Sequence, residues 1–196
     1  MTPASQVRKG MALRLEGDIF RVESAEYHGG QGKMGGVVHT RLKNMRTGAF
    51  WEHRFRSEER LDDLPVEKQA MDFLYSDAED CYFMSPETFE QVSIPRTVIG
   101  AAEKFLKPEM RVPVEFYDGR PLDVYFPDIV EVKVAETAPP MHSQQDNTWK
   151  AATLENGLEI KVPQFIAAGE TIRVDVATAK YVERAKEGKA ESKKAG

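Results

Sequence analysis

Short β-like segments separated by turn residues recur along almost the whole chain. Residues 112–117 and 121–126, for example, flank Asp118-Gly119, a dipeptide typical of tight hairpins. Residues 129–134 alternate apolar and polar side chains, which is the period of a half-buried strand. Strands this short leave many unpaired edges unless each sheet closes on itself. The sequence therefore predicts an all-β fold made of small β-barrels.

The turn signals divide the chain into units of similar length. We expect a first barrel domain at residues 1–65, a second at residues 66–127 and a third at residues 128–187. Units of about 60 residues lie at the small end of what an independent core allows. The charged tail at residues 188–196 contains too little apolar surface to fold, and we expect it to be disordered.

Three segments predict local exceptions to this strand pattern. Residues 57–65 are acidic and irregular, which indicates a linker. A serine followed by a proline predicts that a short helix begins at residue 85 and continues to residue 92. A second short helix is predicted at residues 99–106, stopped by Pro108.

The composition is that of an ordinary soluble globular protein. Hydrophobic residues make up 41% of the chain and charged residues 30%, and no apolar run is long enough to span a membrane. Residues 1–9 lack the apolar core of a signal peptide. The single cysteine, Cys81, fits a reducing compartment and is interpreted as a small buried hydrophobe. We therefore expect a cytoplasmic protein with no membrane partner.

Residues 29–36 form a glycine-rich loop that presents one lysine, Lys33, between two strand-like segments. Five of its eight residues are glycine, more than a tight turn requires. Glycine lets the backbone pass close to another surface because no Cβ stands in the way. The loop is therefore interpreted as a device that projects Lys33 into a narrow place.

Two nucleotide-binding motifs resemble this loop only superficially. Gly30, Gly32 and Gly35 have the spacing of a dinucleotide fingerprint, but that motif requires a following helix. The β-branched residues after the loop predict a strand instead. A phosphate-binding loop would need a glycine at Tyr27 and a serine or threonine at Met34. The sequence therefore gives only weak support to either nucleotide-binding motif.

Positive charge gathers around the loop although the chain has a net charge of -5. Residues 33–56 hold six lysines and arginines against one acidic residue. Arg41 and Lys43, like Arg54 and Arg56, are two residues apart, which places each pair on one face of a strand. Such a face is either merely solvated or binds the phosphates of RNA. The two-residue spacing of these basic residues favours the RNA-binding alternative.

Nothing in the sequence supports catalysis by the chain itself. The histidines lack metal-ligand spacing, and Asp77, Glu79 and Asp80 lie between two strand-like segments, where a turn is expected. No nucleophile with an adjacent base stands out. We expect neither an enzyme nor a metal site nor a cofactor.

Longer motifs carry a resemblance to a known family. Residues 150–169 read KAATLENGLEIKVPQFIAAG, which matches the C-terminal signature of bacterial elongation factor P. Shorter matches follow in the family's order: Lys9-Gly10-Met11, Arg46-Thr47-Gly48, Phe55-Arg56-Ser57, Phe83-Met84, Glu87-Thr88-Phe89-Glu90-Gln91 and Lys180-Tyr181-Val182-Glu183-Arg184. The resemblance covers the chain from about residue 6 to residue 185.

The resemblance implies an SH3-like (KOW-like) barrel followed by two OB-fold barrels, arranged in an L that imitates tRNA. It implies a monomer that binds the 70S ribosome between the peptidyl and exit sites and stimulates peptide-bond formation at polyproline stalls by positioning peptidyl-tRNA. A paralogue of elongation factor P, with the same fold and a different set of clients, is the alternative.

The resemblance also assigns roles to individual residues. Lys33 aligns with the family's tip residue, which contacts the tRNA acceptor end and is often modified by a dedicated enzyme; the lysine is lysylated, otherwise alkylated or left unmodified. The residues around it in the tip loop are Gly30, Gln31, Gly32, Met34 and Gly35. Tyr181 and Arg184 either close a barrel or contact RNA.

Two departures from the family pattern concern loops. Gln31 stands where family members often have proline, and Met34 follows the lysine. Residues 143–148 read SQQDNT in place of the Gly-Asp-Thr run that the family places near the exit-site codon. The resemblance therefore does not extend to contact between this loop and mRNA.

Overall fold

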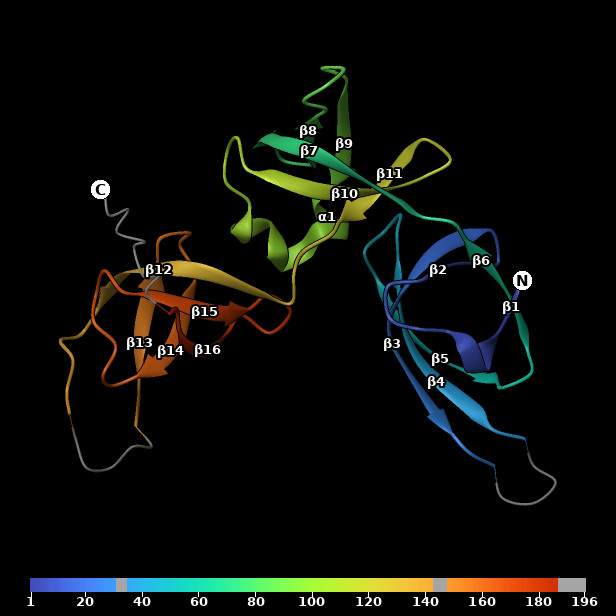
Figure 1. Cartoon of the computed structure of the whole chain (residues 1–196), viewed down its shortest axis with the longest axis horizontal. Helices are drawn as coiled ribbons and strands as arrows, with labels where there is room; N and C mark the ends of the chain where they lie inside the picture. Colours follow the sequence, from blue (N-terminus) through green and yellow to red (C-terminus); the bar gives the residue numbers. More distant parts are fainter. Residues whose placement is uncertain (31–34, 143–147, 187–196) are drawn as a thin grey trace, which may run out of the picture. The chain divides into compact units, whose positions relative to one another are not determined.

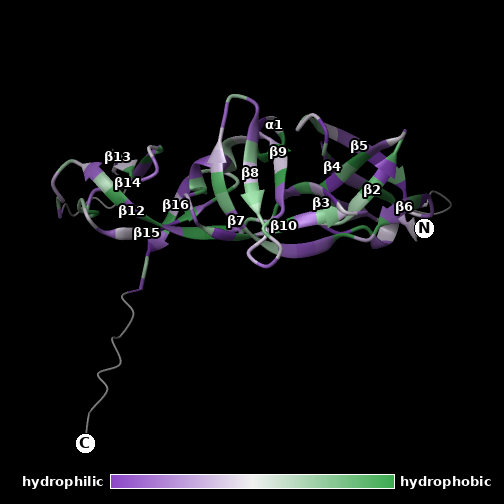
Figure 2. Ribbon diagram, turned by 90° about the horizontal axis from the view of Figure 1, so that it is seen from above, coloured by the Kyte–Doolittle hydropathy of each residue, from purple (hydrophilic) through white to green (hydrophobic). Residues whose placement is uncertain are grey.

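The computed structural model describes residues 1–30, 35–142 and 148–186 and consists of three antiparallel sheets (Figure 1). The all-β class expected from the sequence is confirmed. Hydrophobic and hydrophilic residues are interspersed along the strands (Figure 2), and in β4 every second residue is buried. The expected tail and most of the loop at residues 143–148 lie outside the described residues.

The first sheet has six strands in the order β1-β6-β2-β3-β4-β5. Its elements are β1 (Thr2–Pro3), the 3-10 helix η1 (Ala4–Gln6), β2 (Ala12–Leu15), β3 (Asp18–His28), β4 (Val37–Asn44), β5 (Phe50–Arg56) and β6 (Arg60–Leu64). Leu13, Val22 and Leu42 are completely buried in its core. The Gly17 turn joins β2 to β3, with Glu16 and Gly17 both at positive φ, as a tight hairpin requires.

The prediction of a linker at residues 57–65 is wrong for residues 60–64, which form strand β6. Strand β6 pairs with both β1 and β2 and so belongs to the first sheet. Leu61 and Leu64 are buried, while Asp62 and Asp63 between them remain partly exposed, and Asp63 pairs with the N-terminal amine at 3.0 Å. Asp62 and Asp63, two of the acidic residues that indicated a linker, are therefore partly exposed residues of a strand.

The second sheet has five strands in the order β11-β10-β7-β8-β9. Its elements are β7 (Glu67–Ser76), β8 (Asp80–Met84), β9 (Gln91–Pro95), α1 (Arg96–Ile99), the 3-10 helix η2 (Gly100–Phe105), β10 (Arg111–Tyr117) and β11 (Arg120–Val124). The predicted hairpin at Asp118-Gly119 is confirmed, since both residues have positive φ between β10 and β11. Of the helix expected at residues 99–106, the structure has the 3-10 helix η2.

The helix expected at residues 85–92 is absent, because this segment connects β8 to β9 as a tight loop. The Ser85 hydroxyl accepts hydrogen bonds from the backbone N–H of Glu87 at 3.3 Å and of Thr88 at 3.2 Å. The Ser85 N–H donates to the Glu90 carbonyl at 2.9 Å, which closes the loop into a hairpin. Serine favours both helix starts and such turns, and strand pairing decided between them.

The third sheet has five strands in the order β14-β13-β12-β15-β16. Its strands are β12 (Ile129–Thr137), β13 (Trp149–Leu154), β14 (Glu159–Pro163), β15 (Thr171–Asp175) and β16 (Lys180–Arg184). Lys150 is buried, and its ammonium donates to the carbonyls of Ala138 at 2.5 Å and Ile166 at 2.6 Å. This lysine therefore joins two loops of the sheet from inside.

The first two sheets form one compact unit, residues 1–126, and the third forms another, residues 127–196. Domain boundaries at residues 65 and 127 stay a prediction. Within the first unit, the turn between β4 and β5 reaches the second sheet: Met45 is buried among core residues of that sheet. The two sheets of this unit therefore share part of one apolar core.

An ion pair next to this turn predicts a pH-dependent contribution to stability. Arg46 lies 2.9 Å from Asp18, and together with Asn44 it holds the pKa of the Asp18 carboxyl below its ordinary value of 3.8. A lowered pKa stabilises the fold above pH 3.8, and this contribution disappears as the pH falls through the folded-state pKa. We expect Asp18→Asn to lower the urea midpoint at neutral pH and to match the wild type well below pH 3.8.

The matched control is Asp118→Asn, which changes an exposed carboxylate in a hairpin turn. Its midpoint should stay close to that of the wild type at neutral pH. A difference between Asp18→Asn and the wild type that persists unchanged into strong acid would contradict the assignment to the charged carboxylate.

Candidate RNA-binding surface

The tip loop is carried by the hairpin of β3 and β4, two of the longest strands of the first sheet (Figure 1). The strands pair from Phe20 with Asn44 to His28 with Val37. Gly30 and Gly35 lie at the ends of the described chain on either side of the loop, whereas Gln31, Gly32, Lys33 and Met34 lie outside the described residues. The structure therefore describes the base of the loop.

A tyrosine packs closely on the backbone at this base. A Cβ at Gly36 would lie 2.4 Å from the hydroxyl oxygen of Tyr27, so a side chain there would displace the ring. The carbonyl of Gly36 accepts a hydrogen bond from the N–H of Ser57 at 2.8 Å. Tyr27 and Ser57 thus hold the returning end of the loop. This contact was not predicted from the sequence, where Gly36 counted only as one of the five glycines of the loop.

Three arginines share the outer face of β4 and β5. In the register of these strands, Arg41 is opposite Glu52, His39 is opposite Arg54, and Val37 is opposite Arg56. The arginines are exposed, while the alternate residues, such as Val38 and Phe55, are buried. The two-residue spacing correctly placed Arg54 and Arg56 on one face, and strand pairing adds Arg41 to them.

Lys43 differs from the other expected RNA-binding residues. It lies on the same face of β4, but its side chain is only 11% exposed and its ammonium is 3.2 Å from the Asp123 carboxylate. This part of β4 is covered by the second sheet, which a local sequence pattern cannot show. Lys43 is therefore an internal ion-pair partner and not a residue of the exposed face.

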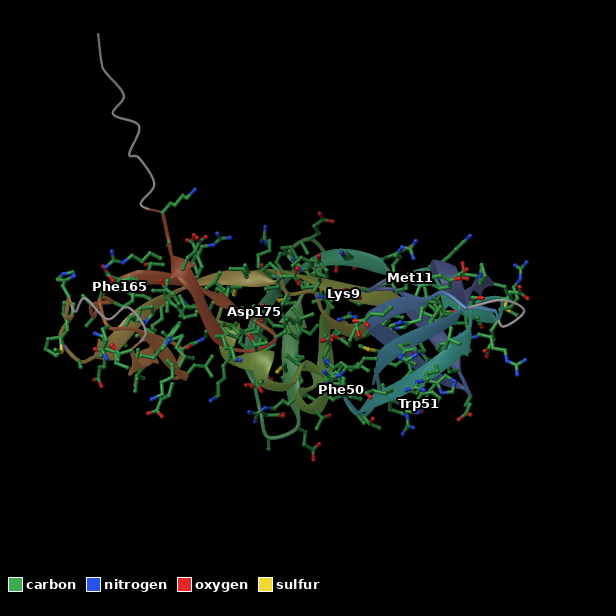
Figure 3. The ribbon with its side chains drawn as sticks, turned by 90° about the horizontal axis from the view of Figure 1, so that it is seen from below. Lys9, Met11, Phe50, Trp51, Phe165 and Asp175 are labelled. Carbon is green, nitrogen blue, oxygen red and sulfur yellow. The ribbon has the colours of Figure 1, made fainter. Side chains whose placement is uncertain are left out.

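Aromatic rings extend the basic face. The Arg41 guanidinium lies over the ring of Phe50, 4.4 Å from its centre, and Phe50 is 54% exposed (Figure 3). The imidazoles of His28 and His39 lie 4.5 Å apart on the same side of the sheet. Cations beside exposed rings are typical of surfaces that bind RNA phosphates and stack on bases. Phe50 and the two histidines were not predicted from the sequence.

The third sheet holds the two remaining expected residues near exposed aromatic rings. Tyr181 lies 6.0 Å from Trp149 between ring centres, and burial raises the pKa of its hydroxyl. Arg184 contacts the Glu170 carboxylate at 3.1 Å and lies over the ring of Phe165, labelled in Figure 3. Trp149 is 53% exposed and Phe165 is 37% exposed. Both expected residues thus help to order an aromatic surface.

The acidic residues Asp77, Glu79 and Asp80 have a structural role. In the described ranges, no cluster of three or more His, Cys, Asp or Glu side chains could hold a metal ion. The Asp77 carboxylate instead accepts the N–H groups of Glu79 and Asp80, each at 2.8 Å, and so forms the expected turn. Across residues 1–30, 35–142 and 148–186, no helix has the length and apolarity that crossing a membrane would take.

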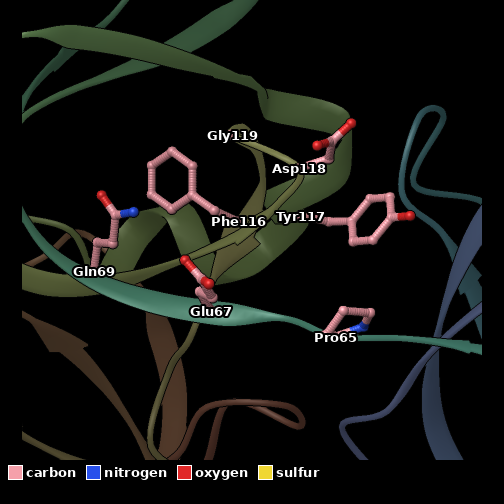
Figure 4. A pocket seen from close by; sticks show the side chains of 7 residues that line it. All are labelled: Pro65, Glu67, Gln69, Phe116, Tyr117, Asp118 and Gly119. Atoms are coloured by element: carbon pink, nitrogen blue, oxygen red, sulfur yellow. The ribbon is translucent and has the colours of Figure 1, made fainter.

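A shallow pocket of about 360 Å³ opens beside the start of β7 (Figure 4). Its lining mixes two carboxylates with aromatic and small residues: Pro65, Glu67, Gln69, Phe116, Tyr117, Asp118 and Gly119. Its polar groups are the carboxylates of Glu67 and Asp118, the Gln69 amide and the Tyr117 hydroxyl.

The comparisons with known proteins agree with this architecture. Three family models match in order along the chain: the elongation factor P KOW-like domain at residues 3–61, the OB domain at residues 66–124 and the C-terminal domain at residues 130–184. Each model falls on one of the three sheets.

Full-length relatives are similar as well. The chain is 40% identical to elongation factor P of Acidobacterium capsulatum, over 93% of this chain and 98% of the relative. It is 38% identical to elongation factor P of Moorella thermoacetica, over 94% of this chain and 100% of the relative. The corresponding protein of Gemmatimonas aurantiaca is 33% identical over 94% and 98%. The chain therefore belongs to the elongation factor P family.

Proposed function

We propose that the protein is a translation elongation factor that binds the 70S ribosome between the peptidyl and exit sites and stimulates peptide-bond formation at consecutive prolines. The observation that carries the proposal is the match of three elongation factor P models, in order, to a chain whose first sheet carries the glycine-rich lysine loop. The protein works in the cytoplasm as a monomer, without a metal or cofactor of its own.

The basic face on β4 and β5 binds the backbone of peptidyl-tRNA. Arg41, Arg54 and Arg56 are exposed on one side of the hairpin that leads to the tip loop. Their guanidinium groups bind phosphates, which fixes where the hairpin lies without reading the base sequence. Phe50 adds a ring on which a ribose or base can pack.

The tip loop then brings Lys33 to the acceptor end of the tRNA. There an extended cation contacts phosphate and ribose of the terminal nucleotides and holds a sluggish prolyl-tRNA in a reactive orientation. Positioning alone can lower a barrier by several kcal/mol, so the chain needs no acid or base of its own. A modifying enzyme that recognises this loop would lengthen the reach of Lys33. The peptidyl-transfer chemistry belongs to the ribosome.

The aromatic surface of the third sheet makes a second RNA contact. Tyr181 and the rings around it present polar and stacking groups, and Arg184 remains 50% exposed beside Phe165. These groups suit a tRNA backbone or ribosomal RNA. The proposal therefore uses all the expected RNA-binding residues except Lys43.

The salt dependence of ribosome binding tests the basic face. Each phosphate contact that is removed lowers the slope of log affinity against log salt by about one. We expect Arg54→Gln with Arg56→Gln to reduce the slope by about two and to weaken binding in co-sedimentation at low salt.

A double variant of two other exposed arginines, Arg60→Gln with Arg120→Gln, is the matched control, since both lie on other strands. It should keep the wild-type slope. Equal slopes for the two double variants would show that charge in general, and not this face, determines binding. Failure of the wild type to sediment with ribosomes would overturn the proposed function itself.

A further inference from the structure

Two barrels of the first unit meet at a joint that has both apolar and charged parts. The apolar part is made by Met45, which is 8% exposed and packs with Val98 and Ile99 of the second barrel, and by Ile19 beside it. The backbone N–H of Met45 donates to the Ile19 carbonyl at 2.9 Å. The hydrogen bond lies within the first barrel, whereas the burial of Met45 among core residues of the second sheet holds the two barrels together; apolar burial alone is non-directional.

The charged part of the joint consists of two cations facing two carboxylates. Arg21 contacts Glu115, and it lies 3.0 Å from Asp123; Lys43 lies 3.2 Å from the same Asp123 oxygen. All four side chains are between 4% and 14% exposed. They are therefore shielded from solvent and from salt, unlike a surface ion pair.

Strand register makes this arrangement directional. Arg21 and Lys43 are direct partners across β3 and β4, and Glu115 and Asp123 are direct partners across β10 and β11. Each barrel thus contributes a like-charged pair, which is unfavourable by itself. The repulsion on both sides is relieved only when the two pairs face each other. Sliding or tilting of the barrels would separate the charges and leave them buried and unpaired.

We propose that these four residues position the first barrel on the second, so that they fix the place that Lys33 reaches when the second barrel is bound. This inference rests on the proposed function. It makes Arg21, Lys43, Glu115 and Asp123 positioning residues, which act through the tip loop and have no contact with RNA themselves.

The strands connect the joint directly to the loop. From Arg21, β3 continues to His28, and seven residues of strand span ~23 Å at ~3.3 Å per residue. A rotation of ~10° at the joint would therefore move the end of the hairpin by ~4 Å. A misplacement of about 1 Å can cost on the order of 100-fold in rate. A loose joint would accordingly impair stimulation without weakening any RNA contact.

Spin-label distances across the joint provide the direct test. Glu58→Cys on the first barrel and Glu87→Cys on the second introduce two exposed labelling sites. The native Cys81 is buried, and burial raises the pKa of its thiol to about 12, so it should not react with the label. The full chain is measured alongside its rate of Pro-Pro-Pro synthesis on ribosomes.

Three kinds of variant separate positioning from mere stability. We expect Arg21→Glu alone and Glu115→Arg alone to broaden the distance distribution and to slow synthesis at least tenfold. The fourfold swap of Arg21→Glu, Lys43→Glu, Glu115→Arg and Asp123→Lys keeps a like-charged pair on each barrel facing the opposite charge and should restore a narrow distribution and most of the rate. Replacing all four residues by methionine should preserve the melting temperature and still broaden the distribution, because buried ion clusters are often replaceable by apolar residues without loss of stability.

Clear outcomes would overturn the inference. A narrow distribution in the four-methionine variant would show that the apolar contact alone fixes the orientation. A swap that fails to restore the distance, although the protein remains folded by circular dichroism, would show that the pairing of these charges is not what matters. If wild-type protein does not stimulate synthesis, the proposed function fails, whereas the distance measurements still report on the joint.

Discussion

Lys33→Ala is expected to abolish the stimulation of Pro-Pro-Pro synthesis while the fold and ribosome binding remain close to those of the wild type. The lysine lies in a loop with five glycines, which carry no side chains. If its ammonium orients the acceptor end, its removal should lower the stimulated rate on the order of 100-fold, toward the rate without the factor. A Pro-Pro-Pro reporter in cells or a purified translation system measures this loss.

Met34→Ala is the matched control, because it shortens a neighbouring side chain of the same loop and leaves the charge in place. We expect this variant to retain most of the stimulation. Lys33→Arg adds information, since it keeps the positive charge but removes the amine that a modifying enzyme would use. Full rescue by Lys33→Ala would contradict the role of the tip residue, whatever the state of its amine.

Gly48→Ala should destabilise the protein more than any other single glycine-to-alanine change named here. Gly48 has φ 77°, where a side chain is strained, and a Cβ there would lie 1.9 Å from the carbonyl oxygen of Thr97. That oxygen belongs to the backbone of α1 in the second barrel, so it cannot rotate away as a side chain would. Overpacking of this kind costs about 1–3 kcal/mol beyond the backbone strain.

Gly17→Ala separates the cost of backbone strain from the cost of overpacking. Gly17 has φ 90°, so alanine meets comparable backbone strain of about 1–2 kcal/mol, but nothing lies within 4 Å of its Cβ position. Urea unfolding followed by circular dichroism should give a lower midpoint for Gly48→Ala than for Gly17→Ala. Equal midpoints would mean that the turn between β4 and β5 does not press on α1, and the described joint would be wrong.

Local chemistry made much of the fold predictable. Asp118-Gly119 predicted a hairpin because both residues tolerate positive φ, and the structure has φ 48° and 73° there. The alternation along residues 129–134 predicted β12 for the same kind of reason, since side chains of a strand alternate between faces. Such signals lie within a few residues of each other, and no distant part of the chain is needed to read them.

Where a local sequence signal fits two different structures, contacts with distant parts of the chain determine which structure forms. Ser85 can begin a helix or close a turn, and the pairing of β8 with β9 selected the turn. The acidic segment around Asp62 indicated a linker, because only pairing with β2 shows that its leucines face a core. These predictions failed because the deciding contacts join residues far apart in the sequence, and not because the local signals were weak.

The candidate site divides in the same way. The two-residue spacing of Arg54 and Arg56 put both on an exposed face, as the structure has them. The spacing could not reveal that Lys43 meets Asp123, which is 80 positions away in the sequence. Nor could it show the Phe50 ring below Arg41, because this contact crosses two strands.

The proposed acceleration of peptide-bond formation at consecutive prolines can be measured in a purified translation system. The measurement compares the rates of Pro-Pro-Pro and Phe-Phe-Phe synthesis with and without the full-length wild-type protein. We expect a large acceleration for the proline template and no change for the phenylalanine template. Equal acceleration of both templates, or none for proline, would contradict it.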